Sequence, residues 1–310
     1  MDETIKSYKA FDENMQCRGF QYEVGKEYDM NGDIKCCKRG FHACESPIEV
    51  WDYYDMLTSR FAEVEQSGKI STEADSTKVC SSHIKIKAEL KLADIINIGV
   101  EWLKDLTSPS KIKDDSATLN DGGFDKKQIG SSGDSAKIGS SGYSAKIGSS
   151  GDSAQIGSSG YSAQIGSSGD SAQIGSSGDS AKIGSSGGYA KIGSSGDSAK
   201  IGSSGYSAQI GSSGDSAKIG SSGDSAKIGS SGDSAKIDST GEDSVIMCAG
   251  PRSVAKAKIG SWITLADWDW DDRKGRLVPV CVKTERVDGI KIKPDTWYKL
   301  QDGEFVEVTE

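Results

Sequence analysis

The sequence lacks any long hydrophobic run. No stretch of about 18 consecutive apolar residues occurs in the chain of 310 residues, so we expect no membrane-spanning helix. The N-terminal segment MDETIKSYKAFDEN has no basic region followed by an apolar one, so we expect no signal peptide. Together these absences predict a soluble, cytoplasmic protein.

The chain also lacks an excess of positive charge. Its 37 lysine and arginine residues face 46 aspartate and glutamate residues, which gives a net charge of -9. Because nucleic-acid backbones repel an acidic protein, we expect no direct nucleic-acid binding. The seven cysteines are an odd number, and without a secretion signal we interpret them as reduced thiols.

Residues 1–106 have the pattern of a small α+β domain, and the polar residues 107–127 are typical of a linker. Pro47 after Ser46 is a common way to begin a helix. Alternating polar and apolar residues indicate half-buried strands. The expected strands cover residues 20–28, 60–68 and 81–92, and the expected helices cover residues 46–57 and 93–106.

A nine-residue repeat fills residues 128–246. Isoleucine returns at every ninth position from Ile129 to Ile237 and again at Ile246, which a disordered linker has no reason to maintain. The unit is A-[KQ]-I-G-S-S-G-[DY]-S, so alanine and isoleucine point inward from one short strand while lysine or glutamine faces water. At the corner, glycine is expected to supply a positive φ that aspartate also tolerates. The repeat predicts a β-solenoid of either hand.

Two repeat units would form a coil of 18 residues, and a triangular coil of three units, 27 residues, is the alternative. In the two-unit coil the variable [DY] positions form two columns, which are the candidate binding surface. A calcium ladder would need a carboxylate on every coil, and tyrosine interrupts both columns. The columns are Tyr143, Tyr161, Asp179, Asp197, Asp215 and Asp233, and Asp134, Asp152, Asp170, Gly188, Tyr206 and Asp224.

Residues 247–310 are predicted to form a small antiparallel β cap, with strands over 261–268, 277–287, 290–300 and 304–310. A bare terminal coil exposes strand edges, which such a cap would cover. Its tryptophans are candidates for packing in the cap or for a homo-oligomer contact: Trp262, Trp268, Trp270 and Trp297.

The segments CRGFQYEVGKEY, KRGFHACESPIEVWDYY and SRFAEVEQSGKI resemble an uncharacterised family of phage and prophage proteins. Members of that family often join this domain to Ser-Gly-Asp repeats and end in a segment like DTWYKL. The resemblance covers nearly the whole chain. It implies a phage or mobile-element origin and carries no known activity or catalytic residue.

Two groups of residues are candidates for chemistry. Cysteine and histidine are zinc ligands, but CCKRGFHAC lacks the paired C-x-x-C spacing, and thiols packed in a core are the alternative. A pair of glutamates together with an arginine resembles the catalytic residues of ADP-ribosyltransferases. The alternative is that both glutamates simply point outward from a strand. The zinc candidates are Cys36, Cys37, His42 and Cys44, and the catalytic candidates are Arg18, Glu63 and Glu65.

These observations favour a noncatalytic, phage-type interaction protein without a cofactor. The expected partner is a host protein or nucleoprotein complex, in the cytoplasm of an infected or lysogenic bacterium, and inhibition of a host defence system is the expected role. The solenoid would be a rigid scaffold. A second role, in which its carboxylate columns imitate the charge of DNA, is disfavoured because lysines are interleaved with the aspartates. The alternatives are a nucleotide- or protein-modifying enzyme of the ADP-ribosyltransferase type and a structural virion or assembly component.

Overall fold

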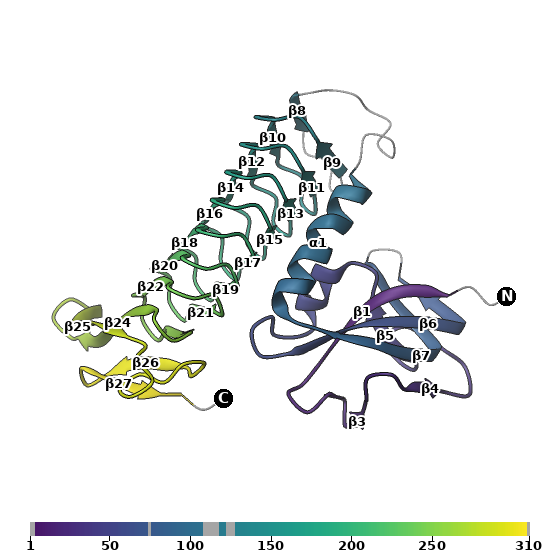
Figure 1. Ribbon diagram of the computed structural model, residues 1–310, viewed down its shortest axis with the longest axis horizontal. Helices are drawn as coiled ribbons and strands as arrows, with labels where there is room; N and C mark the ends of the chain where they lie inside the picture. The colour runs from purple at the N-terminus through teal and green to yellow at the C-terminus, as the bar shows by residue number, and fades with distance from the viewer. Residues whose placement is uncertain (1–3, 74–75, 108–117, 122–127, 309–310) are drawn as a thin grey trace. The chain divides into compact units, whose positions relative to one another are not determined.

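The computed structural model describes residues 4–73, 76–107, 118–121 and 128–308, with only the backbone of residues 118–121. The fold is mainly β, as predicted. Contacts between residues divide the chain into two units, Met1–Trp102 and Leu103–Glu310. Figure 1 shows the strands of both units, and each unit is described by itself below.

The N-terminal unit is built on one antiparallel sheet with the strand order β4-β7-β5-β1-β6. Strands β6 and β7 also pair with each other, so the sheet closes on itself. Alternate residues of the long strands point into the closed sheet, where Val64 and Ile84 are fully buried. The strands are β1 (Ile5–Phe11), β4 (Glu27–Asp29), β5 (Phe41–Cys44), β6 (Arg60–Thr72) and β7 (Lys78–Leu90).

The predicted strands over residues 60–68 and 81–92 are confirmed by β6 and β7. The predicted helix over residues 93–106 is confirmed by α1 (Leu92–Leu106). The carboxylate of Asp94 accepts the N–H of Lys91 at 2.9 Å, which satisfies a backbone donor at the start of this helix.

Two predicted elements of the N-terminal unit were wrong in part. The strand over residues 20–28 is instead β3 (Phe20–Gln21) and β4, because the chain turns between them at Gly25, where φ is +86°. The helix over residues 46–57 is only the 3-10 helix η1 (Pro47–Asp52). Beyond it, the carboxylate of Asp55 accepts the N–H of Leu57 at 2.9 Å, which holds a turn in place of further helix.

The C-terminal unit contains two sheets whose strands alternate along the chain, so that successive coils stack (Figure 1). Each strand pairs in parallel with the strand two positions later, which aligns Ile138 with Ile156 and Ile147 with Ile165. The spacing between these partners confirms the coil of two repeat units and excludes the three-unit coil.

The first sheet contains β8 (Thr118–Asp121), β10 (Lys137–Ser140), β12 (Gln155–Ser158), β14 (Gln173–Ser176), β16 (Lys191–Ser194), β18 (Gln209–Ser212), β20 (Lys227–Ser230), β22 (Val245–Cys248), β24 (Trp262–Asp271) and β25 (Arg276–Arg286). The second contains β9 (Gln128–Ser131), β11 (Lys146–Ser149), β13 (Gln164–Ser167), β15 (Lys182–Ser185), β17 (Lys200–Ser203), β19 (Lys218–Ser221), β21 (Lys236–Ser239), β23 (Val254–Ala257), β26 (Tyr298–Gln301) and β27 (Glu304–Glu307).

The ladder extends past both ends of the predicted repeat. Strand β8 lies within residues 107–127, where a linker was expected, and pairs with β10. The expected solenoid boundary at Ile246 is also passed, because β24 pairs in parallel with β22 from Trp262 to Leu265. Backbone hydrogen bonds do not require the repeat motif, so segments without it can continue the ladder.

The interior of the solenoid is thin. Its isoleucines and alanines are buried, for example Ile183 and Ala181, both with no exposed surface. The serine at the end of each strand also points inward, and the hydroxyls of Ser185 and Ser203 have no hydrogen-bond partner among the described residues. Because little apolar surface is buried in each coil, backbone bonds between coils, such as Lys200 N–H to the Ala181 carbonyl at 2.8 Å, contribute much of the cohesion.

The corner glycines have a different role from the predicted one. The positive φ falls on the serine after the [DY] position, as at Ser198 with φ 56°. The glycine is required for close approach, because a Cβ on Gly196 would lie 2.1 Å from the carbonyl oxygen of Gly178 in the preceding coil. Any side chain at this position would push neighbouring coils apart.

The C-terminal segment closes the ladder with antiparallel strands, as predicted for a cap. Strand β25 pairs with β24, and β26 pairs with both β23 and β27. At the turn Asp302–Gly303 both residues have positive φ, which is typical of a tight hairpin. The strand expected over residues 290–300 is reduced to β26, because the carboxylate of Asp288 accepts N–H groups of the following residues and holds a turn.

Replacing Gly196 by alanine is expected to reduce the free energy of unfolding by about 2 kcal/mol or more, because the new methyl group collides with backbone that cannot move without separating two coils. Gly193→Ala is the matched control, since a Cβ there meets nothing within 4 Å. Its effect should stay within about 1 kcal/mol of zero. Urea unfolding of both variants measures the difference, and equal effects would contradict the close-approach role.

Candidate functional site

The aspartate columns of the candidate binding surface stabilise the stacking of coils. In each column a carboxylate oxygen accepts the backbone N–H of the residue at the same position in the next coil, for example Asp215 N–H to Asp197 Oδ1 at 2.8 Å. A charge-assisted bond of this kind offsets part of the repulsion between stacked carboxylates. The other bonds of this type are accepted by Asp134, Asp152, Asp170, Asp179, Asp215 and Asp224.

Tyrosines interrupt these columns and are exposed. The rings of Tyr143 and Tyr161 stack at 5.2 Å with an interplanar angle of 10°. Tyr206 meets Tyr189, the residue after Gly188, edge to face at 5.8 Å. Lys200 follows Asp197 by three residues and repeats in the ladder as Lys218, so this aspartate column runs beside a basic column. In the other column Asp152 and Asp170 are followed by Gln155 and Gln173 instead. This alternation of charge argues against imitation of DNA.

The tryptophans of the C-terminal segment fall into two groups. Trp297 is buried, and the Lys256 ammonium lies 5.0 Å from its ring centroid. Trp268 donates its indole N–H to the carbonyl of Ala249 at 2.9 Å. Trp262 and Trp270 are exposed, and their role in an oligomer contact remains a prediction.

The N-terminal unit contains a pocket of about 330 Å³. It is formed by β1, by β5, by residues after η1, and by the hairpin of β2 (Gln16–Cys17) and β3. This volume is suited to a small organic ligand. The residues that line it are Tyr8, Lys9, Ala10, Cys17, Arg18, Phe20, Tyr22, Met30, Cys37, Lys38, Arg39, Gly40, Phe41, His42, Ala43, Cys44, Val50, Tyr53, Tyr54 and Lys78.

The charge of the pocket is opposite to that of the protein. Five basic residues line it, and none of its described lining residues is acidic, although the net charge of the whole chain is -9. Concentration of one sign of charge in a cleft attracts the opposite charge in a ligand. The five residues are Lys9, Arg18, Lys38, Arg39 and Lys78.

Lys9 lies at the base of this pocket. Its ammonium donates to the carbonyl oxygen of His42 at 2.9 Å and to the sulfur of Cys17 at 3.4 Å, and it lies 5.4 Å from the centroid of the Tyr22 ring. Burial lowers the pKa of Lys9, and the nearby Cys17 thiol acts in the opposite direction. A buried amine of this kind can donate hydrogen bonds to an anionic ligand from a site with little water.

Arg18 is held at the mouth of the pocket by a strained turn. It joins β2 to β3 together with Gly19, and both residues have positive φ, 53° and 76°. Such a two-residue turn usually contains asparagine and glycine, so arginine costs about 1 kcal/mol at this position. Among the residues that the structure describes, no group accepts a hydrogen bond from its guanidinium or forms an ion pair with it, so the guanidinium is available to a ligand.

Aromatic side chains form one wall of the pocket. Phe20 packs edge to face on Tyr22 at 4.8 Å and on Tyr28 at 5.3 Å, yet 46% of its surface stays exposed. An exposed ring held by other rings provides a flat apolar surface for an aromatic ligand.

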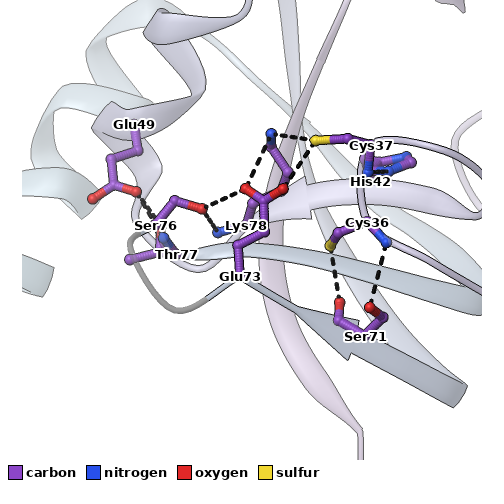
Figure 2. A network of polar contacts seen from close by, with 9 residues as sticks. All are labelled: Cys36, Cys37, His42, Glu49, Ser71, Glu73, Ser76, Thr77 and Lys78. Carbon is purple, nitrogen blue, oxygen red and sulfur yellow. Dashed lines mark hydrogen bonds and ion pairs between the residues drawn. The ribbon is translucent and has the colours of Figure 1, made fainter.

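The cysteine-rich loop next to the pocket brings together a different set of residues from the predicted one. Ligand atoms of Cys36, His42 and Cys80 lie within 4.8 Å of one another. The thiol of Cys37 instead contacts Glu73 at 3.0 Å and Lys78 at 3.3 Å (Figure 2). Cys44 is buried elsewhere, and burial raises the pKa of its thiol to about 12.

Cys80 was missed because it is distant from the other cysteines in the sequence. It lies on β7 directly opposite His42 on β5. The apolar alternation of residues 81–92 predicts the strand, but no sequence signal pairs it with residues 41–44.

The catalytic candidates are not gathered in one site. Glu63 pairs with Lys6 at 2.8 Å and Glu65 pairs with Lys87 at 2.9 Å, both on strand β6. Neither glutamate is among the residues that line the pocket around Arg18. Their geometry fits the alternative of outward strand glutamates.

Lys9→Met is expected to change the pH dependence of stability. Burial places the pKa of folded Lys9 below its ordinary value of 10.5. As the pH falls through 10.5, the unfolded chain therefore binds the proton first, and the wild type loses stability relative to the variant until the folded pKa is reached. Urea unfolding between about pH 8 and pH 11 measures this difference. A constant difference over the whole range would contradict a buried, titrating amine.

Comparison with known proteins identifies one similar family, and that family has no assigned activity. Residues 5–98 match a family described as a domain of unknown function (DUF7666). No curated protein matches the chain, and no solved structure does. Among the described residues, no helix has the length and hydropathy that crossing a membrane requires. The N-terminal unit, with its basic pocket and its Cys-His cluster, is therefore the part of the chain that is similar to a known family.

Proposed function

We propose that the protein is a noncatalytic binding protein whose N-terminal domain binds a mononucleotide, with the solenoid as a rigid scaffold. The observation that carries this proposal is the basic, aromatic pocket in an otherwise acidic protein. A nucleotide combines a negative charge with a flat ring, and the pocket offers partners for both.

The phosphate would bind between Arg18 and Lys9. The guanidinium of Arg18 presents several N–H donors in one plane, which suits phosphate oxygens. Lys9 adds a second hydrogen-bond donor from the buried side of the pocket. The strain at Arg18 supports this role, because a binding residue can be retained at a position that the backbone disfavours.

The base would stack on the aromatic wall. Phe20 is exposed toward solvent while Tyr22 and Tyr28 hold its ring in place. Stacking of a base on an aromatic side chain contributes about 1–3 kcal/mol and tolerates any base. A pocket of about 330 Å³ is at the lower end of the range for small-ligand sites, which favours one nucleotide over a longer oligomer.

Binding without catalysis is supported by the position of the acidic residues. A transferase of the kind resembled by the Glu63–Glu65 pair needs a carboxylate in contact with the ligand. Both glutamates lie on β6 and are paired with lysines of the neighbouring strands β1 and β7, and the described lining of the pocket contains no carboxylate. The partner predicted from the phage resemblance, a host protein or nucleoprotein complex, would be bound by the protein as a whole.

Arg18→Asn should weaken AMP binding by about 10-fold or more, because it removes a charge-assisted contact with phosphate. The same change should leave the unfolding temperature unchanged or higher, since asparagine tolerates positive φ better than arginine. Isothermal titration calorimetry of the full chain with AMP, and a thermal melt, measure the two effects.

Lys85→Gln is the matched control, because it also removes one positive charge but lies outside the pocket and pairs with Glu27. It should leave AMP binding unchanged. No AMP binding by the wild type, or an equal loss in both variants, would overturn the nucleotide proposal.

Deletion of residues 155–190 removes two whole coils and joins Ala154 to Lys191, so the repeat stays in phase. Since the solenoid is proposed as a scaffold, this variant should stay folded and bind AMP with unchanged affinity. Circular dichroism and calorimetry provide the measurements. Loss of binding in a folded deletion variant would show that the solenoid takes part in recognition.

A further inference from the structure

Three metal-binding side chains from separate segments converge beside the pocket. They are Cys36 in the loop before β5, His42 on β5 and Cys80 on β7, with their ligand atoms within 4.8 Å of one another. Two sulfurs and one imidazole nitrogen form a donor set that zinc prefers.

The sheet holds two of these residues rigidly. His42 and Cys80 are direct partners across β5 and β7, so their side chains are on the same face of the sheet. Ser71 is the partner of Cys80 on the other side, in β6. Ser71 in turn binds Cys36 twice, through its hydroxyl to the Cys36 N–H at 3.3 Å and through its carbonyl to the thiol at 3.1 Å (Figure 2).

The imidazole of His42 has the arrangement of a metal ligand. Its Nε2 accepts the N–H of Cys37 at 2.9 Å, so this nitrogen carries the lone pair of the neutral ring. A metal ion would replace the Cys37 N–H at that lone pair.

Gly40 leaves the space that the sulfur of Cys80 occupies. A Cβ at Gly40 would lie 2.2 Å from Cys80 Sγ, and its φ of +132° is itself disfavoured for other residues. The backbone at this position is therefore shaped around the thiol.

We propose that Cys36, His42 and Cys80 bind a zinc ion, with a fourth position open to water or to an exogenous ligand. Tetrahedral zinc sites have donor atoms about 3.6 Å apart, so the cluster needs a contraction of about 1 Å or less. Cys36 is only half-buried, which provides an entry path, and His42 also lines the pocket. This proposal does not depend on nucleotide binding.

The neighbouring cysteines have other partners. Cys37, although next to Cys36 in the sequence, directs its thiol to Glu73 and Lys78. Cys17 contacts Lys9 and Tyr54. Both residues therefore serve as controls with the same chemistry as the ligands.

Titration of the reduced full-length protein with Co²⁺ as a probe for zinc tests the site, followed by displacement with Zn²⁺. One equivalent should produce the thiolate-to-cobalt charge-transfer absorption of a site with two sulfurs. Cys36→Ser and His42→Asn should each reduce the affinity by about 10-fold or more, whereas Cys37→Ser and Cys17→Ser should retain it. Zinc should also raise the unfolding temperature of the wild type but not of Cys36→Ser.

Circular dichroism of each variant separates loss of metal from loss of fold, and Cys36→Ser is the decisive variant because its side chain is only partly buried. Absence of a charge-transfer band in the wild type would overturn the proposal. So would an equal loss of affinity in folded Cys37→Ser and folded Cys36→Ser.

Discussion

The parallel backbone ladder between coils is the interaction on which the C-terminal unit depends. Each coil buries few apolar side chains, and many of its inward serine hydroxyls are unpaired. Cohesion therefore depends on bonds such as Lys200 N–H to the Ala181 carbonyl, repeated from coil to coil. These bonds require close approach at the corners, which explains the glycines such as Gly196. The aspartate columns add charge-assisted bonds along the same direction.

The N-terminal unit uses a different constraint, the closure of one sheet through the pairing of β6 with β7. Closure places β7 beside both β5 and β6, so residues distant in the chain share one face. The pairing of β5 with β7 places His42 opposite Cys80 in the Cys36–His42–Cys80 cluster. The strained turn at Arg18 and the buried amine of Lys9 both reduce stability, and both residues belong to the proposed site for an anionic ligand.

Much of the solenoid could be predicted because its interactions are local and periodic. An isoleucine at every ninth residue requires stacked strands, and the inward alanines follow from strand geometry. The corner chemistry was predicted less well. Positive φ was assigned to glycine, whereas the structure places it on serine and uses glycine for contact with the preceding coil. That contact involves a residue 18 positions away, which no local rule describes.

The sequence by itself determined the repeat architecture, the inward isoleucines and alanines and the presence of several strands in the N-terminal unit, because alternation and period are properties of neighbouring residues. It did not determine that Gln164 and Lys182, expected to face water, are buried. Only the tertiary structure decided which residues form a site. Cys80 replaces Cys37 and Cys44 beside His42 because β5 pairs with β7. Glu63 and Glu65 on β6 are paired with lysines of β1 and β7 and are absent from the pocket lining near Arg18. Strand pairing brings together residues that are far apart in the sequence, and a single sequence does not show which strands pair.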